Sequence, residues 1–164
     1  PKPEKKKCVE YLYVEADEDH IHKQEKNGTE KKGSMIGKLL YLYEGKEQKD
    51  GRKELKNVFY LGGFFSGGEA NRHMFERMQE YIDTNYESRY LNAVYISGDG
   101  GAWIKAGAEY IEKGVPVLDK FHMMKYINKA SNQMLDEAGE AKGRLWKALY
   151  KGTVSYTHLT LPTT

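Results

Sequence analysis

The order in which the hydrophobic period changes along this chain constrains its fold more than any other feature. Three apolar segments rich in Tyr, Leu and Val come first, and their composition and length are typical of β-strands. They are Cys8–Ala16, with His20–Lys23 as a candidate continuation, Lys38–Tyr43 and Asn57–Leu61, which Gly62 and Gly63 would stop. Charged segments containing glycine connect them, so we expect these strands to form an antiparallel meander.

From Glu69 onward, segments with a helical period alternate with short apolar strands. The predicted helices are Glu69–Tyr86, Trp103–Glu112, Phe121–Gln133 and Glu137–Tyr150. The predicted strands are Leu91–Ile96 and Val115–Leu118, and Pro116 favours an edge position for the second of them. Strands joined by helices pack in parallel through right-handed crossovers.

The predicted order, three strands followed by helix, strand, helix, strand and helix, defines an α/β protein. It fits an incomplete ribonuclease H-like mixed sheet, in which three antiparallel strands precede alternating helices and parallel strands. In that fold the first and fourth strands lie side by side and parallel. The pattern alone leaves another mixed α/β fold open.

Charge and length set bounds on the function. A chain of 164 residues with net charge +2 and 30% charged residues suits one ordinary domain. No apolar run approaches the roughly 20 residues of a membrane span, so we expect no membrane partner and a cytoplasmic location. The single cysteine, Cys8, excludes an internal disulfide framework and a cysteine-rich zinc site.

The two ends of the chain read differently from its middle. Residues 1–7 are a basic lead-in that we expect to be disordered. Residues 154–164, VSYTHLTLPTT, carry no charge and no helical period, and they resemble a translated mosaic-end sequencing adapter. A natural Thr-rich tail is the alternative. We therefore expect residues 8–153 to be a partial ribonuclease H-like domain that is truncated at both ends.

Two acidic residues are placed so that they could meet. Asp17 follows the predicted first strand, and Asp99 follows the predicted fourth strand. If those strands are neighbours, both carboxylates lie at one edge of the sheet, where their oxygens would suit Mg²⁺ or Mn²⁺. Phosphodiester chemistry uses two such ions about 4 Å apart. The alternative is that each Asp is a turn residue or a helix cap, and that Glu15–Asp19 is solvated charge.

Three motifs carry a resemblance to a known family: VEADEDH, ISGDGGAWIKAGAEYI and PVLDKFHMMKYI. In order and approximate spacing they resemble the ISLre-type insertion-sequence transposases of bacteria, which are related to the Mutator-like transposases. The resemblance runs from about Cys8 to about Tyr150. It implies a metal site of two Asp and one Glu that holds two Mg²⁺ or Mn²⁺ ions, with Asp17 and Asp99 as the two Asp. No residue of this chain matches the Glu.

The same resemblance assigns an Asp-x-x-His signature to Asp119 and His122 as catalytic-site residues without a defined role. The alternative for His122 is a capped or packed residue near a helix start. His20 and His22 would share one face of a strand, and we interpret them as surface histidines because a third metal ligand is lacking nearby.

The leading functional hypothesis is metal-dependent DNA strand cleavage and strand transfer by the complete enzyme. This fragment would then be inactive without its third acid. The implied partners are DNA, as element ends and target, and further copies of the protein on that DNA. The alternatives are a ribonuclease H-like nuclease or resolvase, and a non-catalytic nucleic-acid-binding piece that touches phosphate through Lys23–Lys32 and Lys46–Lys56.

Overall fold

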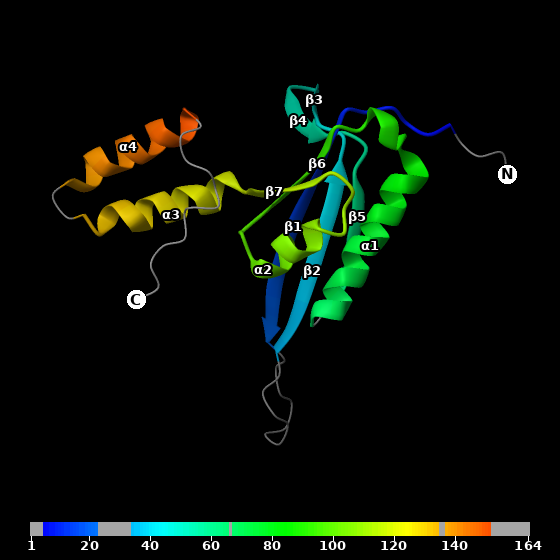
Figure 1. Ribbon diagram of the computed structural model, residues 1–164, viewed down its shortest axis with the longest axis horizontal. Helices are drawn as coiled ribbons and strands as arrows, with labels where there is room; N and C mark the ends of the chain where they lie inside the picture. Colours follow the sequence, from blue (N-terminus) through cyan, green and yellow to red (C-terminus); the bar gives the residue numbers. More distant parts are fainter. Residues whose placement is uncertain (1–4, 23–33, 66, 135–136, 152–164) are drawn as a thin grey trace, which may run out of the picture. The chain divides into compact units, whose positions relative to one another are not determined.

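The computed structural model describes residues 5–22, 34–65, 67–134 and 137–151 (Figure 1). They divide into two compact units between Val117 and Leu118. The first unit contains the sheet and two α-helices that connect its strands, and the second contains a pair of helices. Each unit is described by itself below.

The first unit is built on a five-stranded mixed sheet with the order β5-β2-β1-β6-β7. The strands are β1 (Tyr11–His22), β2 (Ser34–Tyr43), β5 (Phe59–Phe64), β6 (Ala93–Gly98) and β7 (Gly114–Leu118). β1 pairs antiparallel with β2, and β2 pairs antiparallel with β5. β1 and β6 pair in parallel, which confirms the prediction that the first and fourth predicted strands are parallel neighbours. The edge position predicted for the strand with Pro116 is also confirmed.

β5 runs through Gly62 and Gly63, where we expected the strand to stop. Both glycines stay in the ladder because Lys38 and Leu39 of β2 lie opposite them and continue the pairing. Backbone pairing with a long neighbour therefore decides the end of this strand, although glycine itself is unfavourable there.

A small hairpin was missed in the segment between Gly45 and Lys56. β3 (Lys46–Lys49) and β4 (Arg52–Leu55) pair antiparallel in a separate two-stranded sheet. Asp50 and Gly51 form the two-residue turn with φ of 50° and 76°, and an Asp-Gly turn with two positive φ angles is a strong hairpin signal. The charge of the flanking residues hid this signal, since none of them is fully buried.

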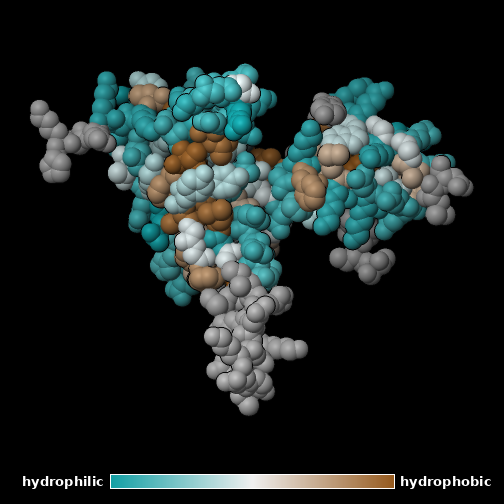
Figure 2. Space-filling model, turned by 180° about the vertical axis from the view of Figure 1, so that it is seen from behind, coloured by the Kyte–Doolittle hydropathy of each residue, from teal (hydrophilic) through white to brown (hydrophobic). Residues whose placement is uncertain are grey.

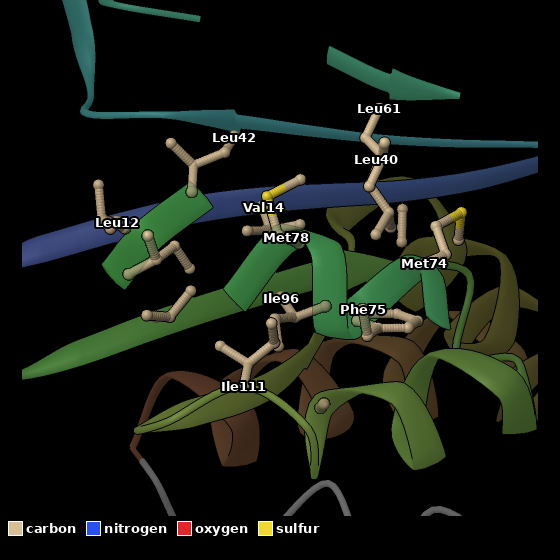
Figure 3. Packing of buried hydrophobic residues seen from close by; sticks show 14 of the residues in the cluster. Leu12, Val14, Leu40, Leu42, Leu61, Met74, Phe75, Met78, Ile96 and Ile111 are labelled. Carbon is tan, nitrogen blue, oxygen red and sulfur yellow. The ribbon is translucent and has the colours of Figure 1, made fainter. Parts of the chain in front are cut away.

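Two helices cover one face of the sheet. α1 (Gly68–Asn85) and α2 (Ala102–Ala108) contact each other, and the short 3-10 helix η1 (Ser88–Tyr90) lies between them in sequence. Figure 3 shows how the buried side chains of α1 meet those of the strands. The core residues labelled there include Leu12, Val14, Leu40, Leu42, Met74, Phe75, Met78 and Ile96. Alternate residues of the strands point to this core, which explains the apolar alternation of the sequence.

The N-terminal lead-in is tied to this unit at its last residue. The Lys7 N–H donates to the Asn85 carbonyl (2.8 Å), and the Glu87 N–H donates to the Lys7 carbonyl (2.9 Å). Lys7 lies in the segment expected to be disordered, yet the backbone after α1 holds it. Residues 1–4 and 154–164 lie outside the described residues, as does the charged loop 23–33.

The second unit pairs α3 (Lys120–Asn132) with α4 (Ala138–Tyr150). Among the side chains of this pair that the structure describes, Ile127, Ser131 and Ala141 are buried. Among the described residues, no helix is long and apolar enough to cross a membrane. Most of the face drawn in Figure 2 is hydrophilic, with a few hydrophobic residues over the sheet-containing unit.

Candidate metal site beside β1 and β6

Asp99 directly follows β6, as the sequence predicted. Its carboxylate oxygen Oδ1 accepts a hydrogen bond from the Gly101 N–H (2.7 Å), so the carboxylate is oriented by its own turn. The turn needs glycine at two points. Gly100 has φ of 85°, and a Cβ on Gly98 would lie 2.8 Å from the Ala16 carbonyl oxygen. The strand bearing Asp99 can therefore approach β1 closely.

Asp17 does not follow the first strand, which corrects the sequence interpretation. β1 continues beyond it to His22, because β2 pairs with β1 as far as His22 and Ser34. Asp17 thus lies within a strand, opposite Leu39, and its side chain is exposed. The Glu18 N–H donates to Asp17 Oδ1 (2.9 Å).

The register of β1 and β6 places the two acids at matching positions. The last paired residues are Glu15 and Ser97, and Asp17 and Asp99 each stand two residues further along. A Cβ on Gly98 would lie against the Ala16 carbonyl oxygen, so β6 approaches β1 closely at the residues directly before these acids. That both carboxylates reach one shared ion stays a prediction. Carboxylate oxygens are the donors that Mg²⁺ and Mn²⁺ prefer, so this donor set fits such an ion.

Two carboxylates are an incomplete set of ligands. No group of three or more His, Cys, Asp or Glu that could hold a metal is found among the described residues. Glu15, two residues before Asp17, already accepts hydrogen bonds from the hydroxyls of Tyr41 and Tyr43, each at 2.9 Å. Burial and the hydrogen bond to Glu15 raise the pKa of Tyr41 to about 12, and they raise that of Tyr43 as well. Glu15 is thus engaged by two tyrosines that stay protonated.

These tyrosines belong to an aromatic face that sequence analysis missed. On the sheet face opposite the core, rings from four strands form a series with centroid distances of 5.4–6.2 Å, in which neighbouring rings are stacked except for Tyr41 and Tyr60, which are tilted by 37°. The series comprises Tyr11, Tyr95, Tyr13, Tyr43, Tyr41 and Tyr60. The alternation of Tyr with core residues in YLYVEA and LLYLY was the available signal.

A shallow pocket of about 340 Å³ lies beside Asp17. Its lining combines acidic residues of β1 with apolar residues and glycines of β2 and β5. The lining residues are Asp17, Glu18, Asp19, Gly37, Lys38, Leu39, Gly63 and Phe64.

Asp119 and His122 form a pair at the start of α3, in the second unit. Asp119 is the N-cap residue, and its Oδ1 accepts from the His122 N–H (2.8 Å) while Oδ2 lies 2.7 Å from His122 Nδ1. The capping alternative is therefore realised by Asp119, which also fixes the imidazole orientation. A catalytic role for this pair stays a prediction. His20 lies 3.9 Å from Glu18 and is exposed, whereas the side chain of His22 lies outside the described residues.

The fold is that of a mixed α/β protein in which β1 and β6 are adjacent parallel strands, with Asp17 within the first and Asp99 directly after the second. The family model of UPF0236, described as an uncharacterised protein family, matches residues 2–154. The chain therefore belongs to the UPF0236 family.

Relatives in one bacterium have about the same similarity to the chain. UPF0236 protein TTE2489 of Caldanaerobacter subterraneus subsp. tengcongensis is 37% identical over 147 residues, which are 90% of this chain and 29% of that protein. UPF0236 protein TTE0402 of the same organism is 37% identical over 147 residues, 27% of its length. The chain thus spans less than a third of these relatives. No solved structure matches it significantly.

The assignment to the ISLre-type transposases, made from three motifs, is wrong as a statement of family. The family that matches nearly the whole chain is UPF0236, and neither its description nor the names of the relatives given above mention a transposase. Short motifs around acids and glycines reflect the local conformation of a few residues. Because unrelated families can share such motifs, they do not by themselves define the family.

Proposed function

We propose that this chain supplies two acidic ligands to a metal-dependent enzyme that cleaves DNA strands and transfers them to new sites. The observation that carries the proposal is the register of the neighbouring parallel strands β1 and β6, in which Asp17 and Asp99 each stand two residues beyond the last paired residues. The two acids belong to different segments of the chain rather than to one loop. Their oxygens can therefore approach divalent ions from two directions, as a site with two metal ions requires.

The sheet order supports the finer fold proposal. With the separate hairpin β3–β4 set aside, the strands in chain order occupy positions 3-2-1-4-5 across the sheet. That order, with three antiparallel strands followed by helix-linked strands, is the one expected for a ribonuclease H-like sheet. We infer that the chain contains the first part of such a domain.

The roles of the residues follow from their surroundings. Asp17 and Asp99 would hold Mg²⁺ or Mn²⁺, which when bound activates the attacking oxygen and stabilises the leaving oxygen of a phosphodiester. The backbone N–H groups of Glu18 and Gly101 orient the two carboxylates. In the second unit, Asp119 would hold the His122 ring in a fixed orientation for a role in proton transfer or DNA contact.

The activity of the whole protein requires more than this chain. Two carboxylates leave an ion weakly held, and an in-line displacement needs two ions in fixed positions. We propose that a Glu in the remainder of the complete protein supplies the missing ligand. DNA, and further copies of the protein assembled on it, are the proposed partners.

The test uses the complete protein with Asp17→Asn or Asp99→Asn. Each change keeps the side-chain shape and removes a charged ligand, so cleavage of DNA carrying the element's own ends should fall by orders of magnitude with Mg²⁺ or Mn²⁺. DNA binding in a gel-shift assay should stay near normal, because binding rests mainly on phosphate contacts.

Asp50→Asn is the matched control. Asp50 is exposed in the β3–β4 turn with φ of 50°, a conformation that Asn tolerates, and this variant should cleave like the wild type. Retained cleavage in the Asp99→Asn enzyme would refute the mechanism. Cleavage of an RNA–DNA hybrid but not of DNA would favour a ribonuclease instead.

A further inference from the structure

A lysine is buried on the core side of the sheet, at the end that carries the candidate metal site. Lys38 of β2 stands opposite Glu18 of β1, and its side chain is only 6% exposed. Burying an ammonium group is costly unless its charge is compensated, and an apolar residue of similar volume is often equally stable in such a place. The presence of lysine here therefore points to a specific role.

The ammonium group of Lys38 contacts three other elements of the first unit. Nζ donates to Asn71 Oδ1 of α1 (2.8 Å), and it lies 3.6 Å from Glu18 Oε2 of β1. It also stands over the Trp103 ring of α2, 4.2 Å from the ring centroid. A cation at this distance over an indole face is attracted to it, and more strongly so when both are shielded from water.

Two of these contacts lead directly to the candidate ligands. Glu18 follows Asp17 in the chain, and its N–H donates to the Asp17 carboxylate. Trp103 packs on the Asp99 turn: a Cβ on Gly101 would lie 3.0 Å from Asp99 Oδ1 and 3.1 Å from Trp103 Cδ1. Lys38 thus sits between the strand that carries Asp17 and the turn that carries Asp99.

We infer that Lys38 is a positioning residue for the metal site, which fixes the Asp99 turn, through Trp103, against the part of β1 that carries Asp17. This inference rests on the proposed function. Lys38 itself bears a positive charge and does not bind the cation. It acts by holding Trp103 and Glu18 in place, as the outer partners of metal ligands do.

The direction of the change in cation affinity distinguishes a positioning role of Lys38 from a simple effect of its charge. Removing a positive charge near a cation site would by itself strengthen cation binding. Loss of geometry at the Asp99 turn would weaken it. A variant that loses the charge and binds the cation more weakly therefore identifies a positioning role.

The first experiment measures Mn²⁺ binding to this chain from the electron paramagnetic resonance signal of free Mn²⁺. Lys38→Met keeps an unbranched side chain and should weaken Mn²⁺ binding about tenfold. Lys46→Met, in the exposed strand β3, removes the same charge elsewhere and should bind like the wild type. Binding by Lys38→Met that equals or exceeds that of the wild type would overturn the inference and leave the proposed function standing.

A second pair of variants leaves Lys38 unchanged, in case its replacement prevents folding. Trp103→Phe keeps an aromatic face for the ammonium group, whereas Trp103→Leu removes it. We expect Phe to retain most of the Mn²⁺ affinity and Leu to lose about tenfold. Equal affinities in these two variants would contradict the role of the Lys38–Trp103 contact.

Fluorescence gives a readout that does not depend on activity. Trp103 and Trp146 are the tryptophans of the chain, so Trp146→Phe leaves Trp103 as the single emitter. Mg²⁺ should shift its emission, and the shift should vanish when Asp99→Asn is added. If the chain binds Mn²⁺ but Mg²⁺ causes no change in Trp103 emission, the inferred link between Trp103 and the metal site is overturned. Absence of Mn²⁺ binding by the wild-type chain would instead overturn the metal site itself, and the inference with it.

Discussion

At the scale of single residues, one buried carboxylate of the first unit is held by several hydrogen-bond donors. Glu44, directly after β2, is 5% exposed and accepts hydrogen bonds from Lys7 (2.9 Å), Asn57 (2.7 Å) and Tyr86 (3.1 Å). Burial acts to raise the pKa of Glu44, but these three donors outweigh it and lower the pKa below the usual 4.5. Glu44 thereby joins the lead-in, the segment between β4 and β5 and the residue after α1.

Glu44 should make the stability of the first unit depend on acid. Because its pKa is lower in the folded state, its contribution is present above pH 4.5 and is lost as the pH falls through the folded-state pKa. Glu44→Gln should cost about 1–3 kcal/mol near pH 7 and much less in acid. Urea unfolding near pH 7 and in acid measures the loss in the free energy of unfolding, with the exposed Glu54→Gln variant as the control. An equal loss at both pH values would contradict the assignment.

At the scale of elements, glycine decides how closely α2 approaches α1. A Cβ on Gly107 of α2 would overlap the Phe75 ring of α1, so the two helices contact each other through a position that admits no side chain. Phe75 in turn lies 6.0 Å from Trp103, ring to ring. The contact of the two helices thus also places the tryptophan that packs on the Asp99 turn.

Gly107→Ala should therefore destabilise the first unit although alanine favours helices. Inserting one methyl group into this contact forces the helices or the ring to move, which costs about 1–3 kcal/mol. Gly68→Ala, where a Cβ at the start of α1 meets open space, is the control and should be neutral or slightly stabilising. Thermal unfolding followed by circular dichroism compares the two. A Gly107→Ala protein as stable as the wild type would show that the contact is looser than the structure has it.

At the scale of the whole molecule, this chain corresponds to 29% of the length of a relative such as TTE2489. The described residues provide a sheet with two candidate ligands and a helical unit with an Asp–His pair. A working site for phosphodiester chemistry needs a further acid to fix the second ion. The remainder of the complete protein is the proposed source of that acid.

The complete protein should therefore cleave DNA in the presence of Mg²⁺ or Mn²⁺, and this chain alone should not. The two proteins are compared at equal concentration on the same DNA substrate, with chelator added as the control. Because two carboxylates hold one ion weakly, even millimolar metal should not rescue the isolated chain. Robust metal-dependent cleavage by this chain would show that the described acids suffice.

The sequence alone predicted most elements and the neighbouring pair of strands. Alternating Tyr and aliphatic residues indicated β1 and β2, and the helical spacing of Met74, Met78 and Ile82 indicated α1. These patterns are readable because periodicity reflects burial on one face of one element. The position of Asp99 after β6 could be predicted for the same reason.

Only the tertiary structure decided the features that depend on a partner distant in sequence. β1 extends past Asp17 and β5 passes through two glycines because β2 pairs with both. Lys38 appeared in the sequence as one more lysine, yet contacts from β1, α1 and α2 bury it beside Trp103. Local patterns report the preference of a segment for its own conformation, whereas pairing and burial of charge depend on neighbours that folding alone brings together.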